Sequence, residues 1–380
     1  MYSFDILPDR IGSDSVKWHE VSSDVLPMWV ADMDIPVPPP IIEAVLGRAK
    51  HPYYGYPYTQ DLLKEPVVSH YKKLYGADVK PEWIVWVPSV IPGVVTALQM
   101  TGGEFMYSVP MYDHIRHLYE EAKLPVTEVP MKRDENNRYS MDFEALENAV
   151  TDKIRTLILC NPHNPVGRVF TREELTELLA FCKKHNLLII SDEIHCELDL
   201  EDRHIPFFSL CEEAAQCSVT ASSAGKICNI PGLPLGFVII PNDELRAKFI
   251  RQQDGLLPSG NVLTFAAYEK AYDGSCARWK DELRAYLKEN RDLVEARFAK
   301  FPEIRFPHNE GTYLQWLDCA AMGLEDPSKF FLEKARVKVS SGEIYGYRQG
   351  VRFNYGCPRA QLIEALDRME KAILEWRESK

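Results

Sequence analysis

The chain has 380 residues, of which 46% are hydrophobic and 26% charged, as is usual for a globular protein of about two domains. Its 44 basic and 56 acidic side chains give a formal charge of −12. This charge argues against nucleic acid or an anionic membrane surface as the main partner, because both attract basic proteins. No apolar run reaches the roughly 18 residues needed to span a bilayer.

The cysteines and the N-terminus indicate the compartment. The nine cysteines are irregularly spaced and include no C-x-x-C pair, which is typical of reduced, mostly buried thiols. The first residues lack a basic region followed by an apolar one, so no secretory signal is visible. We therefore expect a cytoplasmic protein without a structural metal site.

The first two thirds of the chain show an alternating pattern. Residues 1–40 are irregular and end in a proline-rich stretch, and from there to about residue 260 apolar runs alternate with amphipathic segments. The predicted strands are residues 83–87, 104–109, 156–159, 187–191, 218–221 and 235–240. Between them, residues 171–185 have a helical pattern, with Thr171 and Glu174 forming a capping box. The alternation predicts an α/β fold, with a mostly parallel sheet between helices.

The pattern changes after about residue 260. A long helical stretch, residues 262–300, is interrupted near Asp273 and Gly274, and further elements follow it. These are a strand at 312–317, a helix at 329–335, a strand at 351–355 and a final helix at 359–378. We expect a large domain of residues 41–270, a small α+β domain of residues 271–380, and an N-terminal segment of residues 1–40 that packs on the small domain.

Two polar motifs directly follow predicted strands. N-P-H-N-P-V-G at residues 161–167 is a turn that would present an asparagine at the carboxyl end of a strand, where open α/β sheets bind ligands. S-D-E-I-H at residues 191–195 places a carboxylate after a very apolar run, where it needs a cationic partner. Taken alone, the first is equally typical of a loop and the second of a helix-capping aspartate, and His195 alone is more often structural.

Two basic residues complete the set. Lys226 ends the small-residue motif S-S-A-G-K between two apolar runs, where desolvation would make its amine nucleophilic. Arg352 lies on a short predicted strand, where its guanidinium could bind a carboxylate at two points. Each also has an ordinary interpretation as a surface residue. Together, a lysine, a buried aspartate, an asparagine and an arginine fit the chemistry of pyridoxal 5′-phosphate (PLP).

The sequence resembles fold-type I PLP-dependent enzymes of the aminotransferase class I/II superfamily along essentially its whole length. More narrowly, it resembles the cystathionine β-lyase (C–S lyase) subgroup known as MalY/PatB. The motifs that carry the resemblance are V-A-D-M-D at 30–34, Y-G-Y at 54–56, N-P-H-N-P-V-G-R-V at 161–169, D-E-I-H at 192–195, E-G-T-Y-L at 310–314, R-x-N at 352–354 and G-C-P at 356–358. The resemblance implies a large PLP-binding domain, whose seven-stranded sheet lies between helices, and a smaller α+β domain.

The resemblance also assigns roles. Lys226 matches the Schiff-base lysine, which moves protons during catalysis, and Asp192 the partner of the pyridinium nitrogen. Asn164 matches the donor to the phenolic oxygen, Tyr112 the aromatic that stacks on the ring, and Arg352 the residue that binds the substrate carboxylate. Asn164 is expected at the substrate as well.

Further roles concern the cofactor phosphate. Val90 and Ile91 match residues whose backbone N–H groups begin a helix and hold the phosphate, and Ser223 matches a phosphate-binding hydroxyl. Tyr56 matches a catalytic tyrosine that crosses a homodimer interface toward the phosphate of the other subunit. The two remaining expected site residues are His195 at the cofactor and Ala31 at the substrate.

The sequence departs from the family pattern around the phosphate. Ser89 stands where glycine is usual, Gly225 where serine is usual and Cys228 where phenylalanine is usual. Pro234 stands where many aminotransferases have a phosphate-binding arginine, and residues 99–109 form a shorter segment than the family has. The C–S lyase subgroup commonly lacks that arginine too. These departures leave the phosphate site with few charged donors.

The resemblance implies a PLP-dependent C–S β-lyase that cleaves L-cystathionine or another L-cysteine S-conjugate to a thiol, pyruvate and ammonia. Its partner would be a small amino-acid substrate. Two alternatives remain open: an aminotransferase using the same site, because the two reactions share their early steps, and a low-turnover regulatory protein with the same fold.

Overall fold

The computed structural model describes residues 2–7, 9–57, 61–258 and 260–380. Its centre is a seven-stranded sheet with the strand order β2-β10-β9-β8-β7-β3-β4. The strands are β2 (Ile84–Val87), β3 (Glu104–Val109), β4 (Val126–Pro130), β7 (Ile154–Cys160), β8 (Leu188–Asp192), β9 (Ser218–Ser222) and β10 (Gly236–Ile239). β10 runs antiparallel to β2 and β9, and the other neighbouring pairs are parallel. The predicted α/β fold is confirmed.

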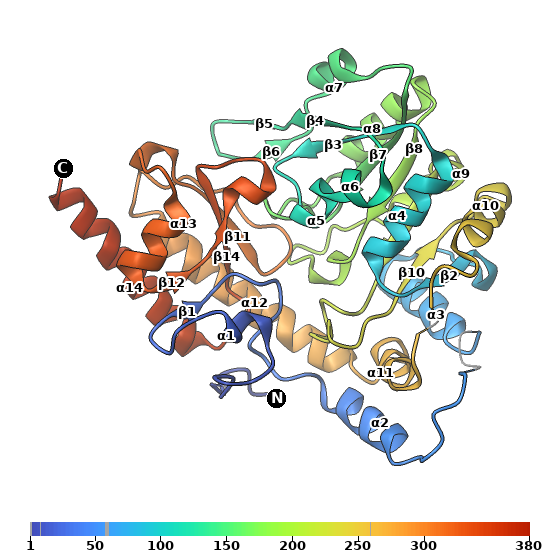
Figure 1. Ribbon diagram of the computed structural model, residues 1–380, viewed down its shortest axis with the longest axis horizontal. Coiled ribbons are helices and arrows are strands. Elements are labelled where there is room, and N and C mark those ends of the chain that lie inside the picture. The colour runs from blue at the N-terminus through green and yellow to red at the C-terminus, as the bar shows by residue number, and fades with distance from the viewer. Residues whose placement is uncertain (1, 8, 58–60, 259) are drawn as a thin grey trace.

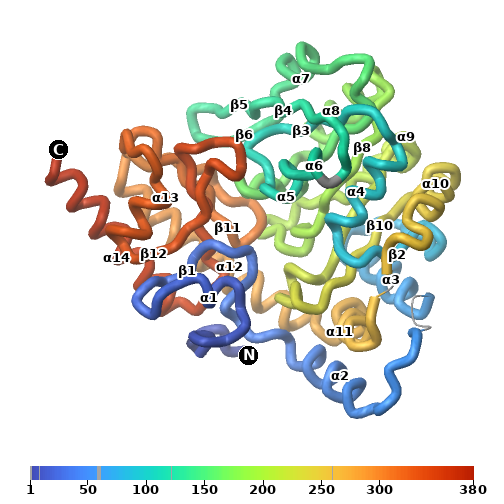
Figure 2. The backbone as a smooth tube through the Cα atoms, in the orientation of Figure 1, coloured from blue at the N-terminus to red at the C-terminus, as the bar shows by residue number. Residues whose placement is uncertain are grey.

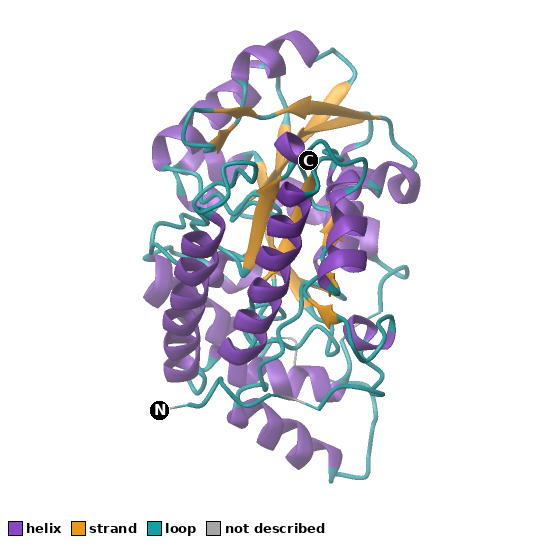
Figure 3. Cartoon of the chain, turned by 90° about the vertical axis from the view of Figure 1, so that its left-hand side faces the viewer, coloured by secondary structure: helices purple, strands orange, loops and turns teal. Residues whose placement is uncertain are grey.

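Helices cover both faces of this sheet (Figures 1 and 3). On β2, Val85 and Val87 pack in one apolar cluster with α4 (Val90–Thr101), whereas Ile84 and Trp86 pack in another on the opposite face. Successive side chains of a strand point to opposite faces, so a strand buried on both faces is apolar throughout. This explains why the sheet strands appear in the sequence as continuous apolar runs.

The other elements of this part of the chain connect and cover the strands. The helices are α2 (Pro39–Ala49), α3 (Lys64–Tyr75), α5 (Asp113–Arg116), α6 (Leu118–Ala122), α7 (Phe143–Ala149), α8 (Arg172–Lys184), α9 (Glu212–Gln216), α10 (Asp243–Gln253) and α11 (Val262–Tyr272), and a small hairpin consists of β5 (Lys132–Arg133) and β6 (Tyr139–Ser140). The predicted capping box at the start of α8 is present, since the Thr171 side chain accepts from the backbone of Glu174 and the Glu174 side chain from that of Thr171.

The C-terminal part of the chain has a sheet of its own. Three strands, β11 (Leu314–Asp318), β14 (Gly350–Asn354) and β13 (Ser340–Ser341), pair antiparallel beside the long helices α12 (Ala277–Phe298) and α14 (Arg359–Glu378). The predicted break in the long helical stretch is present, because α11 ends at Tyr272 and α12 begins at Ala277.

The predicted helix at residues 329–335 is wrong in its boundaries and its type. α13 (Pro327–Phe330) begins earlier, because the Asp326 side chain accepts from the backbone N–H groups of Ser328 and Lys329. A π-helical turn, Phe331–Ala335, follows it and ends at Arg336, whose φ of 56° is left-handed. Periodicity alone cannot distinguish a wide turn of this kind from an α-helix.

The N-terminal segment lies against the C-terminal part, as Figures 1 and 2 show. After the short helix α1 (Val16–His19), β1 (Leu26–Pro27) pairs in parallel with β12 (Val337–Lys338). The chain then leads into α2, which packs against α11. The domain boundaries near residues 40 and 270 stay a prediction. Within the described part of the chain, no helix combines the length and apolar character needed to cross a membrane.

Candidate active site

The predicted site residues gather at the carboxyl ends of neighbouring strands. Asp192 is the last residue of β8, and Asn164 and Lys226 follow β7 and β9, which flank β8. Two cavities adjoin there, with volumes of about 180 and 840 Å³, and both are lined by Tyr112 and Lys226. The smaller cavity is lined in addition by the predicted residues Val90, Ile91, Asn164, Asp192, His195 and Ser223. The larger one is lined by Ala31 and Arg352.

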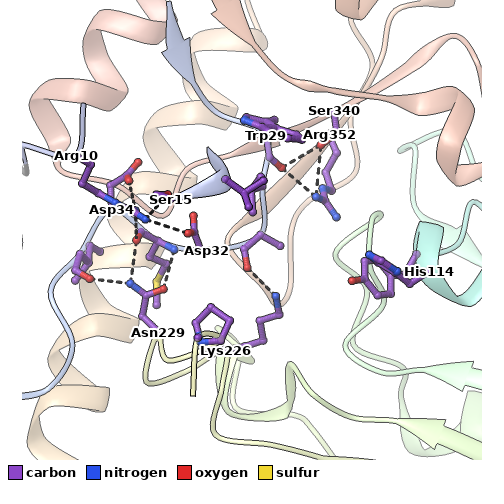
Figure 4. A pocket seen from close by; sticks show the side chains of 18 of the residues that line it. Arg10, Ser15, Trp29, Asp32, Asp34, His114, Lys226, Asn229, Ser340 and Arg352 are labelled. Atoms are coloured by element: carbon purple, nitrogen blue, oxygen red, sulfur yellow. Dashed lines mark hydrogen bonds and ion pairs between the residues drawn. The ribbon is translucent and has the colours of Figure 1, made fainter. Parts of the chain in front are cut away.

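Lys226 lies between the two cavities. Its Nζ donates a hydrogen bond to the Ala31 carbonyl oxygen at 2.7 Å (Figure 4). Burial, with the nearby charge of Arg352, lowers the pKa of Lys226 to about 8. A lysine with this pKa is partly neutral near physiological pH, and the neutral amine is the form that attacks a carbonyl or removes a proton.

Asp192 is the buried carboxylate that the sequence predicts at the end of β8. Its Oδ1 accepts a hydrogen bond from the Ile194 N–H at 3.1 Å, and burial raises its pKa to about 6. The adjacent Glu193 does not share the cavity, because its side chain bonds to Ser191 and His204. Asp192 would therefore be stabilised by a cationic group that enters the smaller cavity.

Asn164 and Arg352 connect the two parts of the chain. The Arg352 Nη1 donates to Asn164 Oδ1 at 3.1 Å, and its Nη2 donates to the Trp29 carbonyl at 3.0 Å. The Arg352 Nε is buried without a hydrogen-bond partner, and no carboxylate among the described residues forms an ion pair with this guanidinium. In Figure 4, Lys226 and Arg352 point into the same space from opposite sides. An unpaired buried guanidinium in this position suits a carboxylate ligand.

His195 is a neutral imidazole at the wall of the smaller cavity. Burial, together with the charges of Lys226 and Arg352, lowers its pKa well below the usual range. Its Nδ1 has no hydrogen-bond partner among the described residues, and its ring lies edge-on to Tyr313 at 6.3 Å between centroids. The imidazole therefore presents a hydrogen-bonding group without adding charge.

Part of the wall of the smaller cavity suits an anion. Ser89 is the N-cap of α4 without a side-chain cap hydrogen bond, and Val90 and Ile91 form the first turn of this helix. The N–H groups and the dipole of a helix N-terminus both favour a phosphate. Ser223 lines the same cavity, and so does Pro234, which stands where many aminotransferases have a phosphate-binding arginine.

Tyr56 is the predicted site residue that the single chain does not bring to the others. Its side chain is fully exposed, and it lines a separate cavity of about 590 Å³ with Arg48 and Phe265. Its predicted position at the phosphate of another subunit stays a prediction.

Sequence reasoning missed the residues that hold the loop around Ala31. The Tyr313 hydroxyl donates to the Ala31 carbonyl at 2.9 Å, and the Asn354 amide donates to the carbonyls of Val30 and Asp32. Asn229, after Lys226, donates to Met33 O and accepts from Met33 N. Tyr313 and Asn354 belong to the motifs E-G-T-Y-L and R-x-N, which carry the family resemblance. The motifs therefore mark both residues, but do not indicate that they hold this loop.

The donor set fits PLP. A buried acid, a lysine with a lowered pKa and a helix N-terminus line one cavity, which matches a pyridine nitrogen, an aldehyde and a phosphate. Among the described residues, no group of three or more histidine, cysteine, aspartate or glutamate side chains could hold a metal ion.

The chain is similar to known proteins over nearly its full length. The family model "Aminotransferase class I and II" matches residues 24–369. The chain is 36% identical to cystathionine beta-lyase PatB of Bacillus subtilis (strain 168), covering 98% of this chain and 100% of that protein. Two solved structures have a TM-score of 0.93 to it: OvoB, at 36% identity over 98% of this chain and 99% of that one, and cystalysin from Treponema denticola, which contains PLP, at 29% identity over 99% of both chains. The chain therefore belongs to the aminotransferase class I and II family.

Proposed function

We propose that this protein is a PLP-dependent C–S β-lyase that cleaves L-cystathionine or related L-cysteine S-conjugates to a thiol, pyruvate and ammonia. The observation that carries the proposal is the meeting of Lys226, Asp192, Asn164 and Arg352 around two adjoining cavities. The similarity to PatB over the whole chain supports the same reaction.

When bound, PLP supplies an aldehyde for an amine and a pyridinium ring that withdraws electrons from the α-carbon of the substrate. The Asp192 carboxylate would keep the ring nitrogen protonated. The Asn164 Oδ1 accepts from Arg352, which leaves its amide N–H₂ to donate to the phenolic oxygen. Tyr112 lines both cavities and would cover one face of the ring.

The substrate would enter through the larger cavity. Arg352 is positioned to bind its carboxylate, and the bond from Arg352 to Asn164 links the substrate site to the cofactor site. Lys226, held by the Ala31 carbonyl and with its pKa lowered to about 8, is suited to remove the α-proton. The cavity of about 840 Å³ leaves room for the sulfur substituent, which departs as a thiol.

We also propose that the active form is a cytoplasmic homodimer. The exposed Tyr56, at a cavity that Lys226 does not line, supports a role in a second subunit. The nine cysteines are free, as in a reducing compartment.

A product assay tests the reaction. With L-cystathionine and no keto-acid acceptor, we expect free thiol, pyruvate and ammonia in equal amounts. Stoichiometric pyridoxamine phosphate, with no thiol from any S-conjugate, would reject the lyase in favour of an aminotransferase. Protein that stays colourless in excess PLP would reject both enzymes.

A further inference from the structure

The phosphate end of the smaller cavity has few polar side chains. In the family pattern that the sequence resembles, serine is usual at position 225 and many aminotransferases have arginine at position 234. This chain has Gly225 and Pro234 at these positions. Among the described residues that line this cavity, Lys226 is the one lysine or arginine. If PLP binds as proposed above, other groups must replace the missing phosphate donors.

A tyrosine from a helix far along the chain also lines this cavity. Tyr268, on α11, is 1% exposed and lines the cavity together with Ser223 and Gly225. Its hydroxyl is 2.7 Å from Ser223 Oγ and donates to the Leu235 carbonyl at 2.6 Å. Ser223 Oγ also lies 2.7 Å from the Leu235 carbonyl and accepts from the Gly225 N–H at 3.0 Å.

The Tyr268 hydroxyl lies where a side chain at position 225 would project. A Cβ added to Gly225 would be 3.2 Å from Ser223 Oγ and 3.6 Å from the Tyr268 hydroxyl oxygen, which are its nearest contacts among the described residues other than Ala224 and Lys226. A serine at this position would therefore meet the same two hydroxyl groups. The Tyr268 hydroxyl therefore lies next to the space that a serine side chain at position 225 would enter.

Two hydroxyl protons are needed at this site, one for the Leu235 carbonyl and one for a bound anion. The Leu235 carbonyl is an acceptor for both hydroxyls, and each hydroxyl has one proton. When one proton satisfies the Leu235 carbonyl, the other is free for an anion. Without the Tyr268 hydroxyl, the Leu235 carbonyl and the anion would compete for the single proton of Ser223.

We propose that Ser223 and Tyr268 form a hydroxyl pair that donates one hydrogen bond to the cofactor phosphate, and that Tyr268 replaces the serine absent at position 225. The two hydroxyls act as a unit, because either one can satisfy Leu235 while the other binds the anion. Tyr268 is thus a phosphate-site residue that local sequence motifs do not identify.

The test compares PLP with pyridoxal, which lacks the phosphate. The full-length protein is stripped of cofactor and titrated with each compound, and binding is followed by absorbance. For Tyr268→Phe we expect PLP to bind about 10 to 100 times more weakly, the usual effect of losing a hydrogen bond to a charged group, with the affinity for pyridoxal unchanged. Tyr272→Phe is the matched control, since Tyr272 lies one turn along α11 and does not line the cavity.

Two further variants test the pairing. Ser223→Ala should weaken PLP binding to a similar degree, and Tyr268→Phe with Ser223→Ala should be little weaker than either single change, because the pair donates one bond. Adding Gly225→Ser to Tyr268→Phe should restore PLP affinity, since it returns a second proton to the pair.

The inference is overturned if Tyr268→Phe binds PLP as tightly as the unmodified protein, or if it loses affinity for PLP and pyridoxal by the same factor. An unmodified protein that fails to bind PLP would refute the proposed function itself, so the two failures are distinguishable. Circular dichroism of the stripped variants separates loss of folding from loss of binding. If Tyr268→Phe does not fold, Tyr268→Leu, which also lacks the hydroxyl, supplies the same comparison.

Discussion

Burial moves the pKa values of two residues that line the smaller cavity in opposite directions. The pKa of Lys226 falls to about 8 and that of Asp192 rises to about 6, because both charged forms are poorly solvated. Their mutual attraction opposes both shifts without cancelling either. In the chain without cofactor, Lys226 therefore offers a reactive amine for the aldehyde of PLP, and Asp192 offers a carboxylate for its pyridine nitrogen.

The attachment of the cofactor should report the pKa of Lys226. In the stripped protein, the rate at which the visible absorption band appears after addition of PLP should rise through a midpoint near pH 8, because the neutral amine is the nucleophile. Lys226→Ala should show no band that borohydride bleaches and almost no turnover. A midpoint near the usual lysine value of 10.5 would contradict the burial argument.

Arg352 should matter for the substrate more than for the fold. Arg352→Ala is expected to lower kcat/KM by a factor that corresponds to about 2–5 kcal/mol, because it removes the guanidinium that would form a buried, hydrogen-bonded charge pair with the substrate carboxylate. Arg352→Lys should recover only part of this loss, since lysine cannot bind a carboxylate at two points. Arg348→Ala is the control, since Arg348 pairs with Glu325 near the surface and does not line the cavities. If steady-state kinetics showed that Arg352→Ala and Arg348→Ala are equally active, Arg352 would not bind the substrate carboxylate.

At the scale of elements, the site depends on one loop, residues 30–35. Side chains from three separate segments hold it, namely Asn229, Tyr313 and Asn354. Its last anchor is Asp34, which is 1% exposed and pairs with Arg10 at 2.7 Å and the buried Lys17 at 2.8 Å. The loop contains Ala31, whose carbonyl oxygen accepts the hydrogen bond from Lys226 Nζ. Packing of the N-terminal segment therefore determines the position of this acceptor.

Loss of the Asp34 carboxylate should loosen this loop. Asp34→Ala leaves Lys17 buried without its closest carboxylate, and we expect about 3–5 kcal/mol lower stability in urea unfolding. Burial alone would raise the pKa of Asp34, but Lys17 and the hydrogen bonds of Trp18 and Gln361 lower it. The unfolded chain therefore binds this proton more readily, and the stabilisation is present at neutral pH and is lost as the pH falls through the folded pKa.

Asp24→Asn is the control for this change, because Asp24 pairs with Arg336 at the surface and should contribute little. If the two variants were equally stable at neutral pH, Asp34 would not anchor the loop.

The elements that the sequence predicted well are those with a strong local signal. The predicted sheet strands lie within two residues of those observed at each end, because strands buried on both faces are apolar throughout. The final helix, Arg359–Glu378, was predicted with the same limits. Strand β4 was not predicted, since it lies at the sheet edge and only Val129 in it is buried. Tyr268 was missed because its contacts with Ser223 and Leu235 span more than 30 residues.

At the scale of the whole molecule, the similarity to known relatives extends over 98–99% of the chain. One chain brings together the predicted groups around the two cavities, apart from Tyr56. The family resemblance implies that Tyr56 acts at the active site of another subunit, and this stays a prediction, because periodicity does not indicate it and a single chain does not test it. An exposed aromatic side chain at a cavity is typical of an interface.

Mixing two defective variants should show whether Tyr56 acts across a dimer. In a heterodimer of Lys226→Ala and Tyr56→Phe, one site would combine the intact Lys226 of one chain with the intact Tyr56 of the other, and the second site would carry both defects. Random refolding makes about half of the dimers heterodimers, so the mixture should recover about a quarter of the unmodified activity, although each variant alone is nearly inactive. Light scattering should give the mass of a dimer for both variants. If Tyr56 served the site of its own chain, every site would contain one defect or the other and mixing would recover nothing, so the recovered activity itself decides where Tyr56 acts.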